Sequence, residues 1–284
     1  MRFPIKVNRA RVPHWLRGVL PIVDDPRRII TAAGDTTLFE SGIGAIKIGS
    51  TWKTTCSNRH PRTDAIIAEF LGSSTSAVVL DVGCSSGLTC ADLVDRLGKA
   101  FSRYYVTDLF FSIPYRIRGG NTYFYHPLTK QCIIRSDGRW IAYQESSEGP
   151  MPLRMLAQWL LDSAPAHDPG QSQNADMLHP RLRVLMSRDD RIVVQEFGVF
   201  DHWGNGPVDV VKAANILNRG YFSTSELRAA LDNLRSVLKP SGMLVVTDNT
   251  ADGLERVSVF RPHASGTLIR ERDVNGGAGV AEIV

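Results

Sequence analysis

The chain lacks the features that would mark it as a membrane-spanning, secreted or metal-binding protein. Its apolar runs are all far shorter than the roughly 20 residues needed to span a bilayer. The first residues have neither the apolar core nor the small-residue cleavage pattern of a secretory signal. Four cysteines are present, with no C-x-x-C pair and no histidine spacing typical of a zinc site. We therefore expect reduced thiols, no metal ion and a cytoplasmic location.

An excess of one charge is also lacking, because 33 Lys and Arg oppose 29 Asp and Glu. The resulting net charge of +4 over 284 residues permits nucleic-acid binding without indicating it. The N-terminal segment is more basic than the rest, with Arg2, Lys6, Arg9, Arg11 and Arg17. We interpret it as a solvated capping segment, and contact with an anionic membrane surface is the alternative.

The most informative segment that is present is residues 78–89. A short β-branched run ends in a loop of small residues that includes Gly83, Cys84, Ser85 and Gly87, and an amphipathic helix is expected directly after it. Small residues let backbone N–H groups approach a ligand closely, and the helix adds its positive dipole end at the same point. A strand, a small-residue loop and a helix in this order predict a nucleotide-type cofactor site.

The same loop spells G-x-S-x-G, which is also the nucleophile elbow of α/β-hydrolases. In that alternative Ser85 would attack an acyl group, and His202 or His263 downstream would serve as its base. Two observations favour the cofactor site instead. Asp81 at the strand end is useful to a cofactor loop but not to an elbow. The strand is also expected to be the first of its sheet, whereas an elbow follows several strands.

The next strand supports the cofactor interpretation. Residues 104–108 form a β-type run that ends in Asp108, which lies 21 residues after Gly87. At an offset of roughly 20 residues from such a loop, an acidic side chain can accept hydrogen bonds from ribose hydroxyls. The alternative is that Asp108 merely begins a turn.

At this point the sequence resembles a known family, the class I S-adenosylmethionine-dependent methyltransferases. The resemblance spans residues 77–248, and Ser85 departs from it because glycine is commoner there. Five matches occur in the family's order, namely the loop of residues 80–87, the acid Asp108, the strand and acid of residues 192–201, the strand of residues 208–217 and the turn and strand of residues 238–246.

The resemblance implies an α/β fold with a Rossmann-like, doubly wound, mostly parallel sheet. It also implies S-adenosylmethionine as the cofactor, with Asp81 and the loop at its amino-acid end, Asp108 at the ribose and Asp201 at the adenine. His202 and Asn215 are weak candidates for catalytic residues, and Asn215 could equally cap the next segment. The positions expected to contact the cofactor are Asp81, Gly83, Cys84, Ser85, Gly87, Asp108, Leu109, Phe200, Asp201 and Asn215.

The methyl acceptor is expected to be a small molecule or a protein side chain. The chain has no Pro-Cys dipeptide, which disfavours cytosine-C5 methylation, and residues 213–216 do not resemble the pocket of amino-group DNA methyltransferases. Residues 215–222 faintly resemble chemotaxis-receptor glutamate methyltransferases, but the preceding residues do not. A scaffold that binds the cofactor without catalysis is a further alternative.

For the domain organisation we expect an N-terminal extension, residues 1–60, that caps the sheet of a methyltransferase domain over residues 61–284. Aromatic runs around Ser136-Asp137-Gly138 predict an inserted β-hairpin over residues 121–145, which could be a lid or a packed edge. A terminal antiparallel hairpin is expected to turn at residues 275–277.

Overall fold

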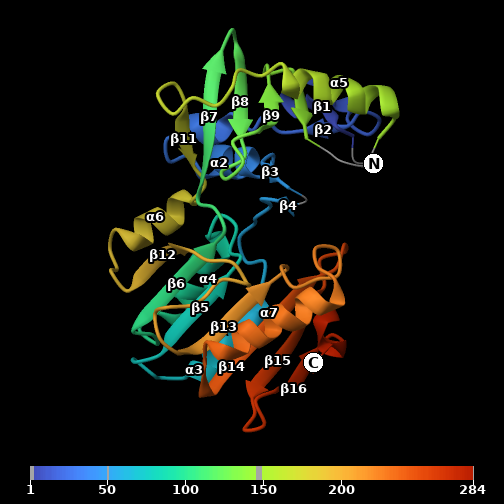
Figure 1. Cartoon of the computed structure of the whole chain (residues 1–284). Coiled ribbons are helices and arrows are strands. Elements are labelled where there is room, and N and C mark those ends of the chain that lie inside the picture. Colours follow the sequence, from blue (N-terminus) through green and yellow to red (C-terminus); the bar gives the residue numbers. More distant parts are fainter. Residues whose placement is uncertain (1–2, 50, 145–148, 284) are drawn as a thin grey trace. The chain divides into compact units, whose positions relative to one another are not determined.

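The computed structural model describes residues 3–49, 51–144 and 149–283, and its contacts divide the chain into two compact units (Figure 1). We call Cys56–Leu109 with Arg181–Val284 the parallel unit, and Met1–Thr55 with Phe110–Pro180 the antiparallel unit. Each unit is therefore built from two separate stretches of chain.

The parallel unit contains a seven-stranded sheet in the order β12-β6-β5-β13-β14-β15-β16. The first five of these strands pair in parallel and the last two pair antiparallel, which confirms the Rossmann-like, mostly parallel sheet. The strands are β5 (Val78–Val82), β6 (Arg103–Asp108), β12 (Ile192–Glu196), β13 (Val208–Ala214), β14 (Leu238–Asn249), β15 (Glu255–Pro262) and β16 (Leu268–Val274).

Helices cover both faces of this sheet, as the alternation of side chains along the strands requires. Leu80 and Val82 of β5 belong to the same buried apolar cluster as Leu227 and Leu231 of helix α7 (Thr224–Ser236). Asp81, between them, faces helices on the opposite side. The helices of this unit are α3 (Pro61–Leu71), α4 (Leu88–Leu97) and α7 (Thr224–Ser236), with α6 (Pro180–Met186) beginning at the unit boundary.

The antiparallel C-terminal hairpin exists, but it lies one strand earlier than the sequence predicted. The N–H of His263 donates to the carbonyl of Thr267, so the turn joins β15 to β16. The expected turn at residues 275–277 instead leads into a short 3-10 helix, η3 (Gly279–Glu282). Two positive-φ glycines at 276 and 277 mark a bend in the chain, but they do not show whether a strand follows.

The antiparallel unit contains a second seven-stranded sheet, in the order β11-β7-β8-β9-β10-β1-β2. Its core consists of buried apolar side chains such as Ile113, Phe124 and Ile134, with Phe39 and Ile43 from a covering helix. The strands are β1 (Ile5–Asn8), β2 (Ile22–Val23), β7 (Ser112–Arg118), β8 (Asn121–Tyr125), β9 (Cys132–Ser136), β10 (Trp140–Tyr143) and β11 (Gln173–Asp176).

Short helices and a small hairpin complete this unit. They are η1 (Arg9–Arg11), η2 (His14–Leu16), α1 (Arg28–Thr31), α2 (Thr36–Ile43), the pair β3 (Lys47–Ile48) and β4 (Thr51–Trp52), and α5 (Met151–Asp162). Among the described helices of the whole chain, none is both long and apolar enough to cross a bilayer.

This arrangement differs from the expected division at residue 60 and from an isolated hairpin over residues 121–145. Strands β8, β9 and β10 belong to the second sheet, and β1 pairs with β10, so the N-terminal segment is part of the same unit. Such pairing between distant segments leaves no local pattern in the sequence. Residue 145 of the expected hairpin and Arg2 lie outside the described residues.

A buried carboxylate joins the two stretches of the antiparallel unit. Asp25 accepts hydrogen bonds from the Arg27 guanidinium (2.7 Å), from Ser136 Oγ in β9 (3.1 Å) and from Asn8 Nδ2 in β1 (3.3 Å). Asn8 Nδ2 also donates to the Gly138 carbonyl at 2.8 Å. The carboxylate therefore holds β1 against the β9–β10 turn.

We expect Asp25→Ala to destabilise the antiparallel unit by about 2–4 kcal/mol, because it leaves buried donors without an acceptor. Urea unfolding would measure the change. Asp24→Ala is the matched control, because the Asp24 carboxylate is less buried (side chain 23% exposed, against 9% for Asp25) and its partner Arg9 is exposed. A loss no greater than that of the control would contradict the assigned role.

Candidate functional site

The strand order of the parallel unit reverses between β5 and β13, and this reversal defines the candidate site. From β5 the chain proceeds outward through β6 to β12 and then returns to β13 on the other side of β5. In open α/β sheets, ligands bind outside the carboxyl ends of the strands at such a switch point. Residues 83–87 follow β5 here, and Asn215 follows β13.

The loop of residues 83–87 has an unusual backbone. Gly83, Ser85 and Gly87 all have positive φ, of 70°, 62° and 77°. Glycine adopts such values freely, whereas Ser85 does so at an energetic cost of roughly 1–2 kcal/mol. The N–H of Ser85 compensates by donating to Asp108 Oδ2 at 2.7 Å. The structure thus brings the Asp108 carboxylate to the loop.

Packing also requires a glycine at position 83. A Cβ there would lie 2.4 Å from Ile216 Cγ2, in the segment that follows β13. The ends of β5 and β13 therefore meet in direct contact, and no larger residue fits between them.

Three buried polar atoms near this edge have no hydrogen-bond partner among the described residues. They are Ser85 Oγ, Ser86 Oγ and His60 Nδ1, and the side chains of Ser86 and His60 are almost fully buried. His60 directly precedes α3, whose Thr63 hydroxyl contacts the Thr247 hydroxyl near the carboxyl end of β14 at 2.5 Å. A buried unpaired polar group costs about 1–3 kcal/mol, which a polar ligand at this edge would recover.

Asp81 lies beneath the loop and points to other protein groups. It is 2% exposed, accepts from the Tyr104 hydroxyl at 2.9 Å and from Cys90 Sγ at 3.2 Å, and lies 3.3 Å from Lys212 Nζ. Lys212 is fully buried and also donates to Asp64 of α3 at 3.1 Å. The Asp81 carboxylate, which the resemblance places at the amino-acid end of the cofactor, is thus taken up by this cluster.

In this cluster one buried cation, Lys212, lies between two carboxylates, Asp81 and Asp64. This arrangement shifts the pKa values of the groups in and around it. Burial acts to lower the pKa of Lys212, but Asp81 and Asp64 outweigh it and raise the pKa, so the ammonium stays charged. Burial raises the pKa of Asp64 to about 6, against the pull of Lys212. Burial, with Lys212 and Arg59, lowers the pKa of His60 to about 3, so its imidazole is neutral at pH 7.

Further residues expected to contact the cofactor lie after β6 and β12, at the surface. Leu109 and Phe200 are half exposed, and a Cβ on Gly198 would lie 2.8 Å from Leu109 Cδ2, so these two segments touch. Asp201 uses its Oδ2 to accept from the Gly198 N–H at 2.6 Å, which closes its own turn. His202 is exposed.

Asn215 is held by the neighbouring strand end. Its Nδ2 donates to Asn249 Oδ1 at 2.9 Å, and its Oδ1 accepts from the Asn249 N–H at 2.7 Å. With φ at 60°, Asn215 is another non-glycine residue in the left-handed region, which asparagine tolerates best. These contacts tie the segment after β13 to the end of β14, which is neither of the two roles, catalysis or capping of the next segment, expected from the sequence.

Ser85 does not have the surroundings of a hydrolase nucleophile. Its Oγ makes no hydrogen bond to a base among the described residues. The strand before it is also the first of the parallel unit's sheet in chain order. Neither observation supports the elbow. The described residues also contain no group of three or more acidic, His or Cys side chains placed to bind a metal ion.

Sequence reasoning missed three residues of this edge, namely His60, Ser86 and Lys212. Ser86 lies within the small-residue loop, but the motif there singles out Gly83, Ser85 and Gly87. Lys212 is a lone lysine within the otherwise apolar Val210–Ala213 stretch, a pattern that indicates a buried, paired charge. His60 has no sequence signal beyond its position before Pro61.

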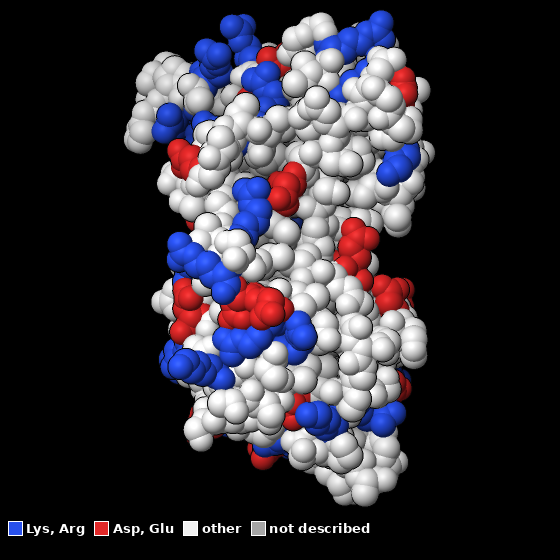
Figure 2. Space-filling view, turned by 90° about the vertical axis from the view of Figure 1, so that its left-hand side faces the viewer, with Lys and Arg blue, Asp and Glu red and all other residues white. Residues whose placement is uncertain are grey.

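The surface gives no indication of nucleic-acid binding on the face drawn in Figure 2. Basic and acidic side chains are interspersed there, and no continuous basic band crosses it. A stripe of Lys and Arg is the usual electrostatic footprint of a nucleic-acid site.

Comparison with solved structures finds methyltransferases. NodS of Bradyrhizobium japonicum, an N-methyltransferase crystallised with S-adenosyl-L-homocysteine, is 15% identical over 71% of this chain and 68% of its own, with a TM-score of 0.37. CalS10 of Micromonospora echinaspora, an amino pentose methyltransferase with bound S-adenosylmethionine, is 12% identical over 76% and 75%, with a TM-score of 0.35.

The 1,6-didemethyltoxoflavin-N1-methyltransferase of Burkholderia thailandensis is 15% identical over 76% of this chain and 61% of its own, with a TM-score of 0.37. No family model and no curated protein matches the sequence. At these identities and TM-scores the likenesses carry no substrate across to this chain. The fold assignment rests on the strand order and pairing described above.

We expect Gly83→Ala to destabilise the parallel unit by about 2–4 kcal/mol, because the added Cβ meets Ile216 and the residue keeps a positive φ. A double-mutant cycle with Ile216→Ala separates the two causes. In the Ile216→Ala background the cost of Gly83→Ala falls by about 1–3 kcal/mol, measured by urea unfolding. An equal cost in both backgrounds would refute the contact.

Asp64 and His60 give opposite pH dependences. Between pH 3.8 and about 6, folded Asp64 holds a proton that the unfolded chain has lost, so this group stabilises the fold as the pH falls. Between pH 6.5 and about 3, His60 stays neutral in the folded chain but is protonated in the unfolded chain. The free energy of unfolding therefore decreases as the pH falls through this range.

Asp64→Asn should therefore lose stability relative to the native chain as the pH falls from 6 towards 4, by up to about 1.4 kcal/mol per pH unit. His60→Gln should gain relative stability over the same range. Urea unfolding at pH 4 to 8 measures both. If the free energy of unfolding changed with pH in the same way for the native chain and for Asp64→Asn, the result would contradict the buried cluster.

Proposed function

We propose that this chain is a class I S-adenosylmethionine-dependent methyltransferase that acts on a small molecule or a protein side chain. The observation that carries the proposal is the switch point between β5 and β13. A positive-φ loop lies there, bound to the Asp108 carboxylate, beside buried polar atoms that lack partners. This combination suits a ligand with a ribose and a polar end.

The residues at this edge fit the parts of S-adenosylmethionine. Asp108 has two oxygens with about four lone pairs, so it can accept from ribose hydroxyls while it accepts from Ser85 N. Ser86 Oγ and His60 Nδ1 offer hydrogen bonds to the amino-acid end. Leu109 and Phe200 present exposed apolar surface for the adenine, with Asp201 beside them.

When bound, S-adenosylmethionine supplies a methyl group activated by a positively charged sulfur. The protein then has to bind and orient the cofactor and the acceptor, and to exclude water from them. Most of its contribution to such a transfer lies there. His60 is suited to this site because its lowered pKa keeps it neutral next to a cation. Two carboxylates likewise offset the charge of the buried Lys212.

The acceptor's chemistry determines whether a base is needed. An acceptor that must lose a proton requires a side chain within hydrogen-bond reach, and an already deprotonated one does not. His202, exposed in the segment after β12, and Asn215, tied to Asn249, are the candidates from the sequence. Of the two, only His202 has a side chain that can take up a proton.

Calorimetric titration tests the proposal. We expect S-adenosylmethionine and S-adenosylhomocysteine to bind, and NAD and ATP to bind much more weakly or not at all. Asp108→Asn should weaken binding of S-adenosylmethionine at least about tenfold, because it loses a charged acceptor for the ribose. Asp232→Asn, on the exposed side of α7, is the matched control and should bind like the native chain.

The outcomes separate the alternatives. Absence of S-adenosylmethionine binding to the folded chain would overturn the proposal. Ester turnover that Ser85→Ala abolishes would favour the hydrolase. Binding without methyl transfer to any tested amine, hydroxyl, thiol or carboxylate acceptor would favour a non-catalytic scaffold.

A further inference from the structure

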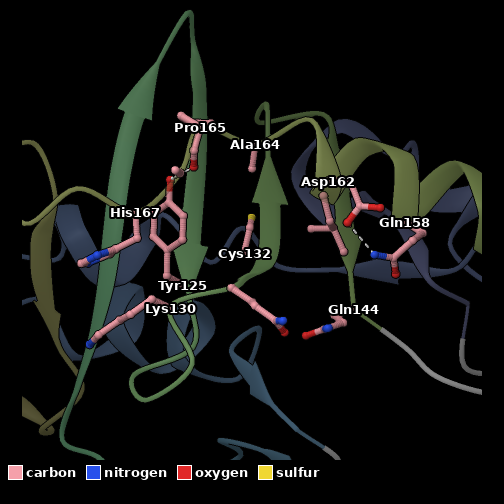
Figure 3. Close-up of a pocket in the computed structure, with 12 residues that line it drawn as sticks. Tyr125, Lys130, Cys132, Gln144, Gln158, Asp162, Ala164, Pro165 and His167 are labelled. Atoms are coloured by element: carbon pink, nitrogen blue, oxygen red, sulfur yellow. Dashed lines mark hydrogen bonds between the residues drawn. The ribbon is translucent and has the colours of Figure 1, made fainter.

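The antiparallel unit contains a cavity that the proposed function does not use. It has a volume of about 270 Å³ and lies between the ends of β8 and β9, helix α5 and residues 164–167 (Figure 3). Ligand pockets start at about 300 Å³, so this volume suits a single ring compound and not a long chain.

One wall of the cavity is fixed by a buried tyrosine. The Tyr125 hydroxyl donates to the Pro165 carbonyl at 2.9 Å, and its ring meets the His167 ring edge-on at 5.3 Å between centroids. Burial raises the pKa of Tyr125 to about 12, so the hydroxyl remains a donor. The segment of residues 164–167 is thereby held to the sheet.

Three glutamine side chains line the same cavity. Figure 3 shows the carboxamide of Gln144 extending towards the centre of the group, with Gln158 on the α5 side. Gln158 Nε2 donates to Asp162 Oδ1 at 2.7 Å, which orients its amide. Gln131 and Gln144 are exposed at the cavity. Each carboxamide offers two donors and an acceptor, so the three can bind several hydroxyls at once.

The charges at the cavity disfavour an anionic ligand. Asp162 contributes a carboxylate, and the Lys130 ammonium donates to the Pro127 carbonyl in its own turn and points away from the glutamines in Figure 3. A phosphate or carboxylate would meet repulsion from Asp162, while the Lys130 ammonium is held within its own turn. Cys132, which is half-buried, and the edge of the buried Leu161 form the apolar part of the lining, against which the C–H face of a ring can lie.

We propose that this cavity binds a neutral, hydroxyl-rich ring, the size of one monosaccharide unit. The carboxamides of Gln144 and Gln158 would bind its hydroxyls, and the Leu161 and Cys132 surface would contact its C–H face. This site lies wholly within the antiparallel unit and goes beyond the proposed function.

Uncharged methyl glycosides of glucose, galactose, mannose and N-acetylglucosamine are the probes, in the full chain without S-adenosylmethionine. We expect at least one to give saturation-transfer NMR signals and a millimolar Kd by titration. Gln144→Ala and Gln158→Ala should each weaken that binding about fivefold or more. Gln195→Ala, which removes a glutamine of β12 in the parallel unit, is the matched control and should leave it unchanged.

Three results would overturn the inference. They are absence of binding by all four glycosides, equal binding by the native chain and the two cavity variants, and tighter binding of glucose 6-phosphate or adenosine than of any glycoside. Circular dichroism melting curves that match the native chain show that the variants are folded. Because no S-adenosylmethionine is present, failure here leaves the proposed function untouched, and failure of the proposed function leaves this test intact.

Discussion

The parallel unit depends on one ammonium group buried between two carboxylates. Lys212 of β13 joins Asp81 of β5 and Asp64 of α3, with Lys212 wholly removed from water. Well-packed apolar side chains could give similar stability, so we do not attribute the cluster to stability alone. A buried charge has to lie next to its counter-charges, so few alternative registers between β5 and β13 are possible. It thereby fixes the ends of β5 and β13, where the positive-φ loop and Asn215 begin.

The sequence predicted the parts of the site that follow from local pattern. The loop of residues 83–87 and the acid at the end of β6 could be found because a strand, small residues and a helix leave a signature within about 30 residues. The role of Asp81 could not, because a carboxylate at a strand end looks the same whether it faces a ligand or a lysine far along the chain. His60 has no signature at all, since its importance comes from burial and an unpaired nitrogen.

The same distinction applies to the fold. The alternation of strands and helices after residue 61 predicted the parallel sheet, and β15 with β16 form the antiparallel end. The aromatic residues of 121–143 predicted strands correctly but not their partners, because β1 pairs with β10 across more than a hundred residues. A carboxylate such as Asp25, which joins Asn8 to Ser136, becomes visible only once the chain is folded.

The interleaving of the two units bears on how the chain emerges from the ribosome. The first 55 residues need partners from 110–180, and residues 56–109 need partners from 181–284, so neither unit is complete when its first half has been made. Strand β5 emerges long before β13 and its lysine, which leaves Asp81 without a counter-charge in the nascent chain. Domains usually fold in order during synthesis, whereas both units here have to wait for distant segments. Apolar strands such as β5 therefore stay without their sheet neighbours until the later stretch of the same unit has been made.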